Sequence, residues 1–165
     1  MFNNFQKLNA AILFICLIMV AGSFYLQYGL ELEPCPLCIL NRISVMILTV
    51  VTLFVVCFPI KKVIYQKIIG LISSTLALSG LGVAIRHVYL QNLPPEAIPD
   101  CGPGFDYLIE SFSLTQALTM ILKGSGQCSE IAFQLLGVSL AEWTAISFFI
   151  LSLLTLWLLI NKFHS

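Results

Sequence analysis

The residues in this sequence with the clearest capacity for chemistry are two cysteines separated by two residues, Cys35-Pro36-Leu37-Cys38. Pro36 suits the first position of a helix, where its missing N–H is not needed, so Cys35 is expected at the cap and Cys38 one turn inside. Both sulfurs then lie on one face near unsatisfied amide N–H groups, which stabilise a thiolate. Such a pair can cycle between dithiol and disulfide with little backbone movement, as redox catalysis requires.

A second pair of cysteines, Cys101 and Cys128, lies later in the chain, each beside glycines that leave the backbone exposed. A bridge between them could be structural, contributing about 3 to 4 kcal/mol in the chain-entropy model. It could also be a disulfide open to attack, and the CxxC favours this interpretation because thiol–disulfide exchange lets two pairs trade electrons. A zinc site of all four cysteines is a further possibility. However, 26 residues separate the second pair, whereas structural zinc sites usually have two close pairs.

Three charged or titratable side chains could assist these cysteines. Arg42 lies four residues after Cys38 and therefore on roughly the same helical face, one turn deeper. Its fixed charge would stabilise the Cys38 thiolate and the anionic form of a bound electron acceptor. The alternative is an arginine that snorkels to the headgroups. Arg86 and His87 are expected at similar depth, where either could bond an acceptor's oxygen or act as an interfacial anchor.

The elements that must position these residues are membrane helices. Of the 165 residues, 59% are hydrophobic and only 10% are charged, which excludes an ordinary soluble domain. Four uncharged intervals of 18 to 23 residues are each long enough to cross a bilayer as a helix. The first interval is too long for the apolar region of a signal peptide, so we expect it to be retained. We predict one membrane domain over residues 1–165, with spans at about 8–28, 37–58, 68–89 and 143–161.

The distribution of charge orients the predicted bundle. An even number of spans puts both termini on one side, and that side is flanked by Lys7, Lys61, Lys62, Lys67 and Lys162. By the positive-inside rule it is the cytoplasm, which then also contains the short loop 59–67. The loops 29–36 and 90–142, with all eight carboxylates, lie on the outer side. Zero net charge gives no reason to expect nucleic acid as a partner.

The long outer segment carries a helical pattern of its own. Apolar residues recur there at spacings of three and four: Leu108, Ile109, Phe112, Leu118, Ile121 and Leu122. They predict a short amphipathic helix that either lies on the membrane surface or packs on the outer end of the bundle. Trp143 then opens the last span as an interfacial anchor. The predicted fold class is therefore an all-α integral membrane protein, a four-transmembrane-helix bundle with one long outer loop.

This topology divides the six cysteines into two classes. Cys16 and Cys57 fall within spans, where a cysteine behaves as a small hydrophobic residue, and we assign them no role. The other four fall on the outer side, in an oxidising compartment where thiols normally become disulfides. Four outer cysteines make two pairs.

At these residues the sequence resembles the disulfide bond formation protein B (DsbB) family. Cys-Pro-Leu-Cys-Ile-Leu-Asn-Arg, at positions 35–42, resembles the family's CxxC followed by arginine. Segments 86–91, 99–104 and 124–130 match its outer segment. The resemblance covers nearly the whole chain. A CxxC at the start of the second span, with two spaced cysteines between the third and fourth, is a highly specific combination.

The resemblance implies a relay that begins outside the membrane. A thioredoxin-like periplasmic oxidase, DsbA, would be reoxidised when its thiolate attacks a Cys101–Cys128 disulfide, with Cys101 forming the mixed disulfide. The protein would lie in the bacterial inner membrane, with both termini in the cytoplasm and the active cysteines facing the periplasm.

The resemblance also implies where the electrons end. They would pass to Cys35 and Cys38, and Cys38 as a thiolate would donate them to ubiquinone or menaquinone. This quinone would be held without a covalent bond near Arg42, with His87 as a weaker candidate contact.

Two other interpretations compete with this one. A relative that resembles vitamin K epoxide reductase would also combine a helix bundle, a CxxC and a quinone, but in that family the CxxC lies late in the chain rather than at the second span. Alternatively, the chain is a membrane scaffold or metal-binding module whose outer cysteines are staples or ligands; stoichiometric zinc without thiol-dependent quinone reduction would favour that.

Overall fold

The computed structural model describes residues 4–58, 60, 62–94, 96, 113–124, 126–129, 131 and 133–161. Within them lie four long helices, α1 (Asn4–Phe24), α2 (Pro36–Cys57), α3 (Val63–Gln91) and α7 (Leu140–Ile160). The first continues into a π-helical turn, η1 (Tyr25–Gly29). Each of the four is long and apolar enough to cross a membrane, which confirms the predicted four-helix membrane fold.

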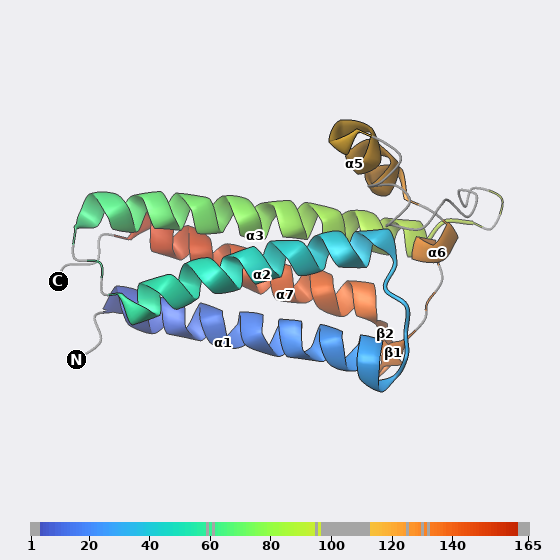
Figure 1. Cartoon of the computed structure of the whole chain (residues 1–165), viewed down its shortest axis with the longest axis horizontal. Helices are drawn as coiled ribbons and strands as arrows, with labels where there is room; N and C mark the ends of the chain where they lie inside the picture. The colour runs from blue at the N-terminus through green and yellow to red at the C-terminus, as the bar shows by residue number, and fades with distance from the viewer. Residues whose placement is uncertain are drawn as a thin grey trace.

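The four long helices lie side by side as a bundle (Figure 1). α3 packs most extensively on α7, and α2 packs against both α1 and α3. The facing sides form a core of buried residues: Phe5, Ile12, Cys16, Val45, Leu48, Val55, Ala77, Ala84, Phe148, Leu151 and Leu158. Large apolar side chains such as Phe54, Ile72 and Phe149 are exposed on the outside, as expected for helices that face lipid.

Glycines let α3 and α7 approach each other closely. A Cβ added at Gly80 would collide with the ring of Phe148. A Cβ at Gly70 would lie 3.1 Å from the backbone of Leu159. Small residues at the interface of membrane helices allow this backbone-level packing, which supplies dispersion contacts that lipid cannot replace.

Several helices extend beyond the predicted spans. α1 begins at Asn4 and α3 at Val63, so the exposed side chains of Lys7 and Lys67 lie on the first turns of helices rather than before them. Uncharged intervals predict where hydrocarbon begins and ends, but a helix continues into the headgroup region without penalty. α7 begins at Leu140, three residues before Trp143, because Ser139 and Glu142 form a capping box at its start.

One end of the bundle, here called the cysteine end, contains the start of α2 and three shorter elements. These are α5 (Leu114–Lys123), α6 (Gly126–Ser129) and a hairpin of β1 (Gln134–Leu135) with β2 (Val138–Ser139). The first residues of α1 and the last of α7 lie together at the other end, here called the opposite end (Figure 1).

α5 is the amphipathic helix that the sequence predicted in the long outer loop. Residues 97–112 lie outside the described part of the chain. The prediction that Leu108, Ile109 and Phe112 belong to the apolar face of this helix therefore stays a prediction. Ile121, near the end of α5, is buried in a cluster with Leu37 and Leu90. Elsewhere on the helix apolar side chains are exposed, namely Leu118, Met120 and Leu122. Ile121 thus attaches the end of the helix to the bundle, while these three apolar side chains stay uncovered.

The small hairpin before α7 was not expected, because the sequence predicted only loop there. Its strands pair antiparallel, with Gln134 opposite Ser139 and Leu135 opposite Val138. The turn places Leu136 at φ 57° and Gly137 at φ 80°, the left-handed conformation that a tight two-residue turn requires. Trp143 of α7 donates its indole N–H to the Leu135 carbonyl at 3.2 Å. The hairpin therefore covers the start of the last helix.

Candidate redox site

The CxxC lies at the start of α2 as the sequence predicted. Cys35 is the cap residue and Pro36 the first helical residue, and the Cys35 sulfur accepts a hydrogen bond from the Cys38 N–H at 3.4 Å. The two Sγ atoms are 3.2 Å apart. Cys35 is buried and Cys38 partly exposed. Free amide groups at a helix start carry a partial positive charge, so negative charge is favoured at this end of α2.

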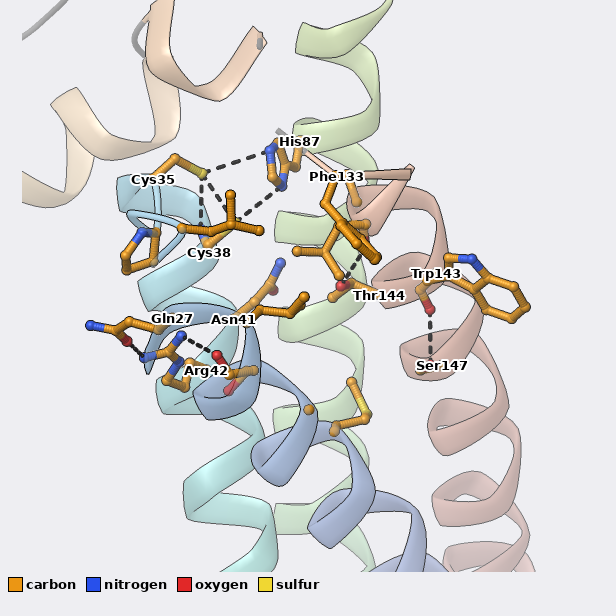
Figure 2. A pocket seen from close by; sticks show the side chains of 18 of the residues that line it. Gln27, Cys35, Cys38, Asn41, Arg42, His87, Phe133, Trp143, Thr144 and Ser147 are labelled. Carbon is orange, nitrogen blue, oxygen red and sulfur yellow. Dashed lines mark hydrogen bonds between the residues drawn. The ribbon is translucent and has the colours of Figure 1, made fainter. Parts of the chain in front are cut away.

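His87 reaches across from α3 and faces both sulfurs of the pair (Figure 2). Its Nε2 lies 3.7 Å from Cys35 Sγ and its Nδ1 3.9 Å from Cys38 Sγ. The imidazole is 5% exposed, so its exchange of protons with bulk water is restricted. The ring can therefore donate to, or accept from, either cysteine, depending on its tautomer.

Arg86, the neighbour of His87 in the sequence, has a different position and role. Its guanidinium donates to the carbonyls of Leu122 and Lys123 at 3.2 and 3.0 Å. It also lies 5.2 Å from the centre of the Tyr89 ring. The two carbonyls are among those at the end of α5 that lack helical partners. The sequence pattern gave Arg86 and His87 the same possible roles. In the structure the Arg86 side chain bonds to α5, whereas the His87 side chain contacts the cysteines.

Cys128 is placed next to this group. It lies in α6, is fully buried, and belongs to the same apolar cluster as Cys35 and Leu37. Of the four cysteines assigned to the outer side, three are therefore gathered at the cysteine end. Cys101 lies outside the described residues, so its pairing with Cys128 stays a prediction.

Arg42 is held inside the bundle, one turn below Cys38 (Figure 2). Its guanidinium donates to the Gln27 side chain and, at 3.1 Å, to the Ser23 carbonyl. It also lies 4.9 Å from the centre of the Phe24 ring. Because all three partners belong to α1 or η1, Arg42 joins the first two helices. This arrangement favours the interior position over an arginine that snorkels to the headgroups.

A cavity of about 530 Å³ opens beneath the cysteines. Residues of α1, α2, α7 and the hairpin enclose it, and His87 of α3 reaches it. Its polar lining includes Gln27, Cys35, Cys38, Asn41, Arg42 and His87, whereas most of its surface is apolar, with Met19, Leu26, Val45, Leu140 and Phe148 among the contributors. An apolar cavity with a few convergent polar groups is the usual form of a small-molecule site.

Two buried polar atoms on the cavity lining have no partner among the described residues. They are the Asn41 side-chain oxygen and the Arg42 Nε. Asn41 is 4% exposed. Leaving a buried polar group unsatisfied costs about 1 to 3 kcal/mol, so this lining fits a ligand that both accepts and donates hydrogen bonds. Sequence reasoning passed over Asn41 and Gln27, although a polar side chain within a membrane helix is itself a signal of function.

The remaining two cysteines stand apart from the site. Cys16 is buried in the main core of the bundle. Cys57 is the last residue of α2 and is exposed. Neither lines the cavity.

The bundle and its site together define a class of protein: a four-helix membrane protein with a thiol pair at the edge of an interior cavity. Comparison with known proteins gives the family. The family model described as "Disulfide bond formation protein DsbB" matches residues 6–158, so the chain belongs to the DsbB family. As a member it is a disulfide-forming membrane oxidoreductase.

Similar proteins share most of their length with this chain. A relative from Azoarcus sp., named "Disulfide bond formation protein B", is 40% identical over 159 residues, covering 96% of this chain and 95% of the relative. A protein of the same name from Nitrosococcus oceani is 38% identical, covering 87% of this chain and 85% of its own. A third, from Chromobacterium violaceum, is 41% identical with 87% and 86% covered.

Proposed function

We propose that this protein is a thiol:quinone oxidoreductase that reoxidises a DsbA-type dithiol oxidase and passes the electrons to a membrane quinone. One observation carries the proposal. Cys35, Cys38 and His87 meet at the edge of a cavity whose lining also includes Arg42, one turn below Cys38. A thiol pair, a proton carrier and a fixed cation are thereby grouped around one apolar space, as two-electron transfer from thiols to a lipid-soluble acceptor requires.

The first exchange takes electrons from the partner. A thiolate of the DsbA-type protein attacks Cys101 of a Cys101–Cys128 disulfide, forms a mixed disulfide and releases Cys128 as a thiolate. The partner's second thiolate then attacks the mixed disulfide, so the partner leaves oxidised and both cysteines of this chain are reduced. The burial of Cys128 beside Cys35 supports this step, because the released sulfur is already packed against the CxxC.

The second exchange moves the electrons to the CxxC. The Cys128 thiolate attacks Cys35 of a Cys35–Cys38 disulfide and releases Cys38 as a thiolate. Cys101 then closes the bond with Cys128 and leaves Cys35 as a thiol. Cys38 suits the leaving position, because the Cys35 thiol can donate to its sulfur at 3.2 Å and the charge of Arg42 lies one turn deeper, so both stabilise the anion.

The last step reforms the Cys35–Cys38 disulfide. The Cys38 thiolate and the Cys35 thiol together release two electrons and one proton, and His87 accepts the proton at Nε2, the nitrogen that faces Cys35. A quinone bound in the cavity would supply the oxidising power as a two-electron acceptor. Of the two protons that its reduction to a quinol requires, one would be the Cys35 proton held by His87, and the other would come from water, which takes up the proton that the partner's dithiol releases. Arg42 and Asn41 would hold the quinone. The amide of Asn41 suits both redox states, because it can donate to a carbonyl or accept from a hydroxyl. We propose ubiquinone or menaquinone, bound without a covalent link.

The same proposal orients the protein in the bacterial inner membrane. Described lysines at the opposite end, Lys7, Lys62 and Lys67, are exposed, and the positive-inside rule assigns that end to the cytoplasm. Lys61 and Lys162, which the sequence prediction also used, lie outside the described residues. The cysteine end then faces the periplasm, where the DsbA-type partner is found, and both termini are cytoplasmic.

A spectroscopic assay tests the function directly. Purified protein in detergent is mixed with a soluble quinone and a reduced DsbA-type protein, and loss of quinone absorbance is followed. We expect catalytic loss in the wild type and none with Cys38→Ala. Cys57→Ser is the matched control, because Cys57 is exposed at the far end of the same helix. Absence of quinone reduction by the wild type, with its outer disulfides intact, would mean that the cysteines are structural.

A further inference from the structure

The cluster at the cysteine end is also a donor set for a metal ion. Cys35, Cys38 and His87 each offer one ligand atom, and these atoms all lie within 4.8 Å of one another. A ligand set of two thiolates and an imidazole binds Zn²⁺ in preference to harder cations such as Mg²⁺ or Ca²⁺. The three residues come from two helices, α2 and α3, and line the cavity together.

The distances between these atoms are close to those that zinc requires. Bonds of about 2.3 Å to sulfur and about 2.0 Å to nitrogen in a tetrahedron place two sulfurs about 3.8 Å apart and a sulfur about 3.5 Å from a nitrogen. The Cys35 and Cys38 sulfurs are 3.2 Å apart, and Nε2 of His87 is 3.7 Å from Cys35 Sγ. The nitrogen that faces Cys38 is Nδ1, at 3.9 Å, so a rotation of the imidazole is needed to bring one nitrogen to an ion held by both sulfurs.

We propose that the dithiol form of this site binds one Zn²⁺ through Cys35, Cys38 and His87, and that the bound ion stops turnover. Each thiol releases its proton and forms one S–Zn bond, and neutral His87 gives a nitrogen. The fourth position faces the cavity and takes water. No electrons are transferred, because zinc is not redox-active. A disulfide offers no thiolate, so only the reduced site binds the metal.

The block follows from which groups the ion occupies. Zinc holds both sulfurs that must join in a disulfide and the imidazole that takes up the Cys35 proton. The zinc-bound protein is therefore held reduced until the metal is removed. Binding stands on the geometry alone, whereas the inhibitory consequence rests on the function proposed above.

This site differs from the zinc site considered from the sequence. That site used all four outer cysteines, which would make a closed structural centre. The site in the structure uses His87, which the sequence analysis considered as a contact for an electron acceptor rather than as a metal ligand, and it leaves one position open. Its ligands are also the redox groups, so metal binding competes with electron transfer rather than stabilising the fold.

Binding is tested with Zn²⁺ alone against a colorimetric chelator, using anaerobically reduced, purified protein. A Cys101→Ser/Cys128→Ser background removes the outer pair as alternative ligands. We expect one zinc per reduced chain in this background and none after oxidation of the CxxC. His87→Gln should weaken binding at least tenfold, and Cys57→Ser should not change it. Loss of binding in the double-serine background, or unchanged binding in His87→Gln, would overturn the assignment. Circular dichroism confirms that each variant keeps its helices.

Inhibition is measured separately in the quinone assay. Saturating Zn²⁺ should stop wild-type turnover, and EDTA should restore it, whereas His87→Gln should retain a larger share of its own activity at the same zinc concentration. Full wild-type turnover at saturating zinc would refute the inhibitory role. If zinc-free protein shows no turnover, the proposed function has failed, and the binding titration still decides whether the metal site exists.

Discussion

The two ends of α2 carry the same residue type in opposite surroundings. At the start of the helix, Cys35 and Cys38 lie among free amide groups with His87 across from them. At the other end Cys57 is exposed on the last turn, where carbonyl groups without helical partners carry partial negative charge. One helix thus places cysteines in two different electrostatic surroundings. The difference lies in helix polarity and in what the neighbouring helices bring, not in the cysteine itself.

The same contrast holds for how the two ends of the bundle are fixed. Helices that begin at the cysteine end have side-chain caps, Cys35 for α2 and Ser139 for α7. At the opposite end, α3 begins after Lys62 with no side-chain cap. At the cysteine end, directional hydrogen bonds hold the helix starts near the cysteines in place. At the opposite end, where no functional side chain has to be oriented, apolar packing is sufficient.

The largest expected effect comes from exchanging sulfur for oxygen at the two ends of α2. Cys35→Ser should reduce turnover by roughly 10³-fold or more, because it removes the sulfur that Cys128 attacks and that must later join Cys38 in a disulfide. Cys57→Ser should stay within about twofold of wild type. The quinone assay measures both. Equal losses in the two variants would remove the distinction between the ends.

A second comparison concerns the two arginines of the cysteine end. Arg42→Ala should weaken quinone affinity by about 10- to 100-fold, since a hydrogen bond to a charged group contributes about 1.5 to 3 kcal/mol. Arg86→Ala should leave quinone affinity unchanged and instead expose α5 to proteolysis, because its partners are the Leu122 and Lys123 carbonyls. Titration with a short-chain quinone and limited proteolysis distinguish the two. A matching loss of affinity in Arg86→Ala would place it in the binding site after all.

Two glycines on α3 test how closely the helices must pack beside the cavity. Gly80→Ala should lower stability by about 1 to 3 kcal/mol, because the new Cβ collides with Phe148, which also lines the cavity. Gly82→Ala meets nothing within 4 Å and should be neutral or slightly stabilising. Thermal unfolding in detergent gives both values. A neutral Gly80→Ala would show that the bundle adjusts freely at this point.

The smallest expected effect concerns the cap of α7. Ser139→Ala should cost about 1 kcal/mol, because Ser139 accepts from the Glu142 N–H and also donates to the Gln91 side chain at 2.8 Å. Ser79→Ala is the control, since its hydroxyl is exposed and bonds only within its own helix. The same thermal measurement applies. A cost no greater than that of Ser79→Ala would mean that the cap is not needed once the bundle has formed.

Much of this molecule is predictable from its sequence, because the controlling signals are local. Charge spacing predicts the four helices, and Pro36 predicts the start of α2 with Cys35 at its cap. The rest depends on packing. Whether Arg86 or His87 faces the cysteines is decided by the rotation of α3 against α2. The hairpin at 134–139 needs Leu136 in a conformation that its residue type does not favour. Gln27 becomes relevant only once α1 lies against Arg42.

The adjacency of Arg86 and His87 has a mechanical consequence. Both belong to one turn of α3. Arg86 donates hydrogen bonds to carbonyls at the end of α5, whereas His87 contacts the sulfurs of the CxxC. A force that displaces α5 is therefore transmitted through Arg86 to the backbone that carries His87. Because that turn is part of α3, a movement of the short outer helix reaches the imidazole by way of a transmembrane helix.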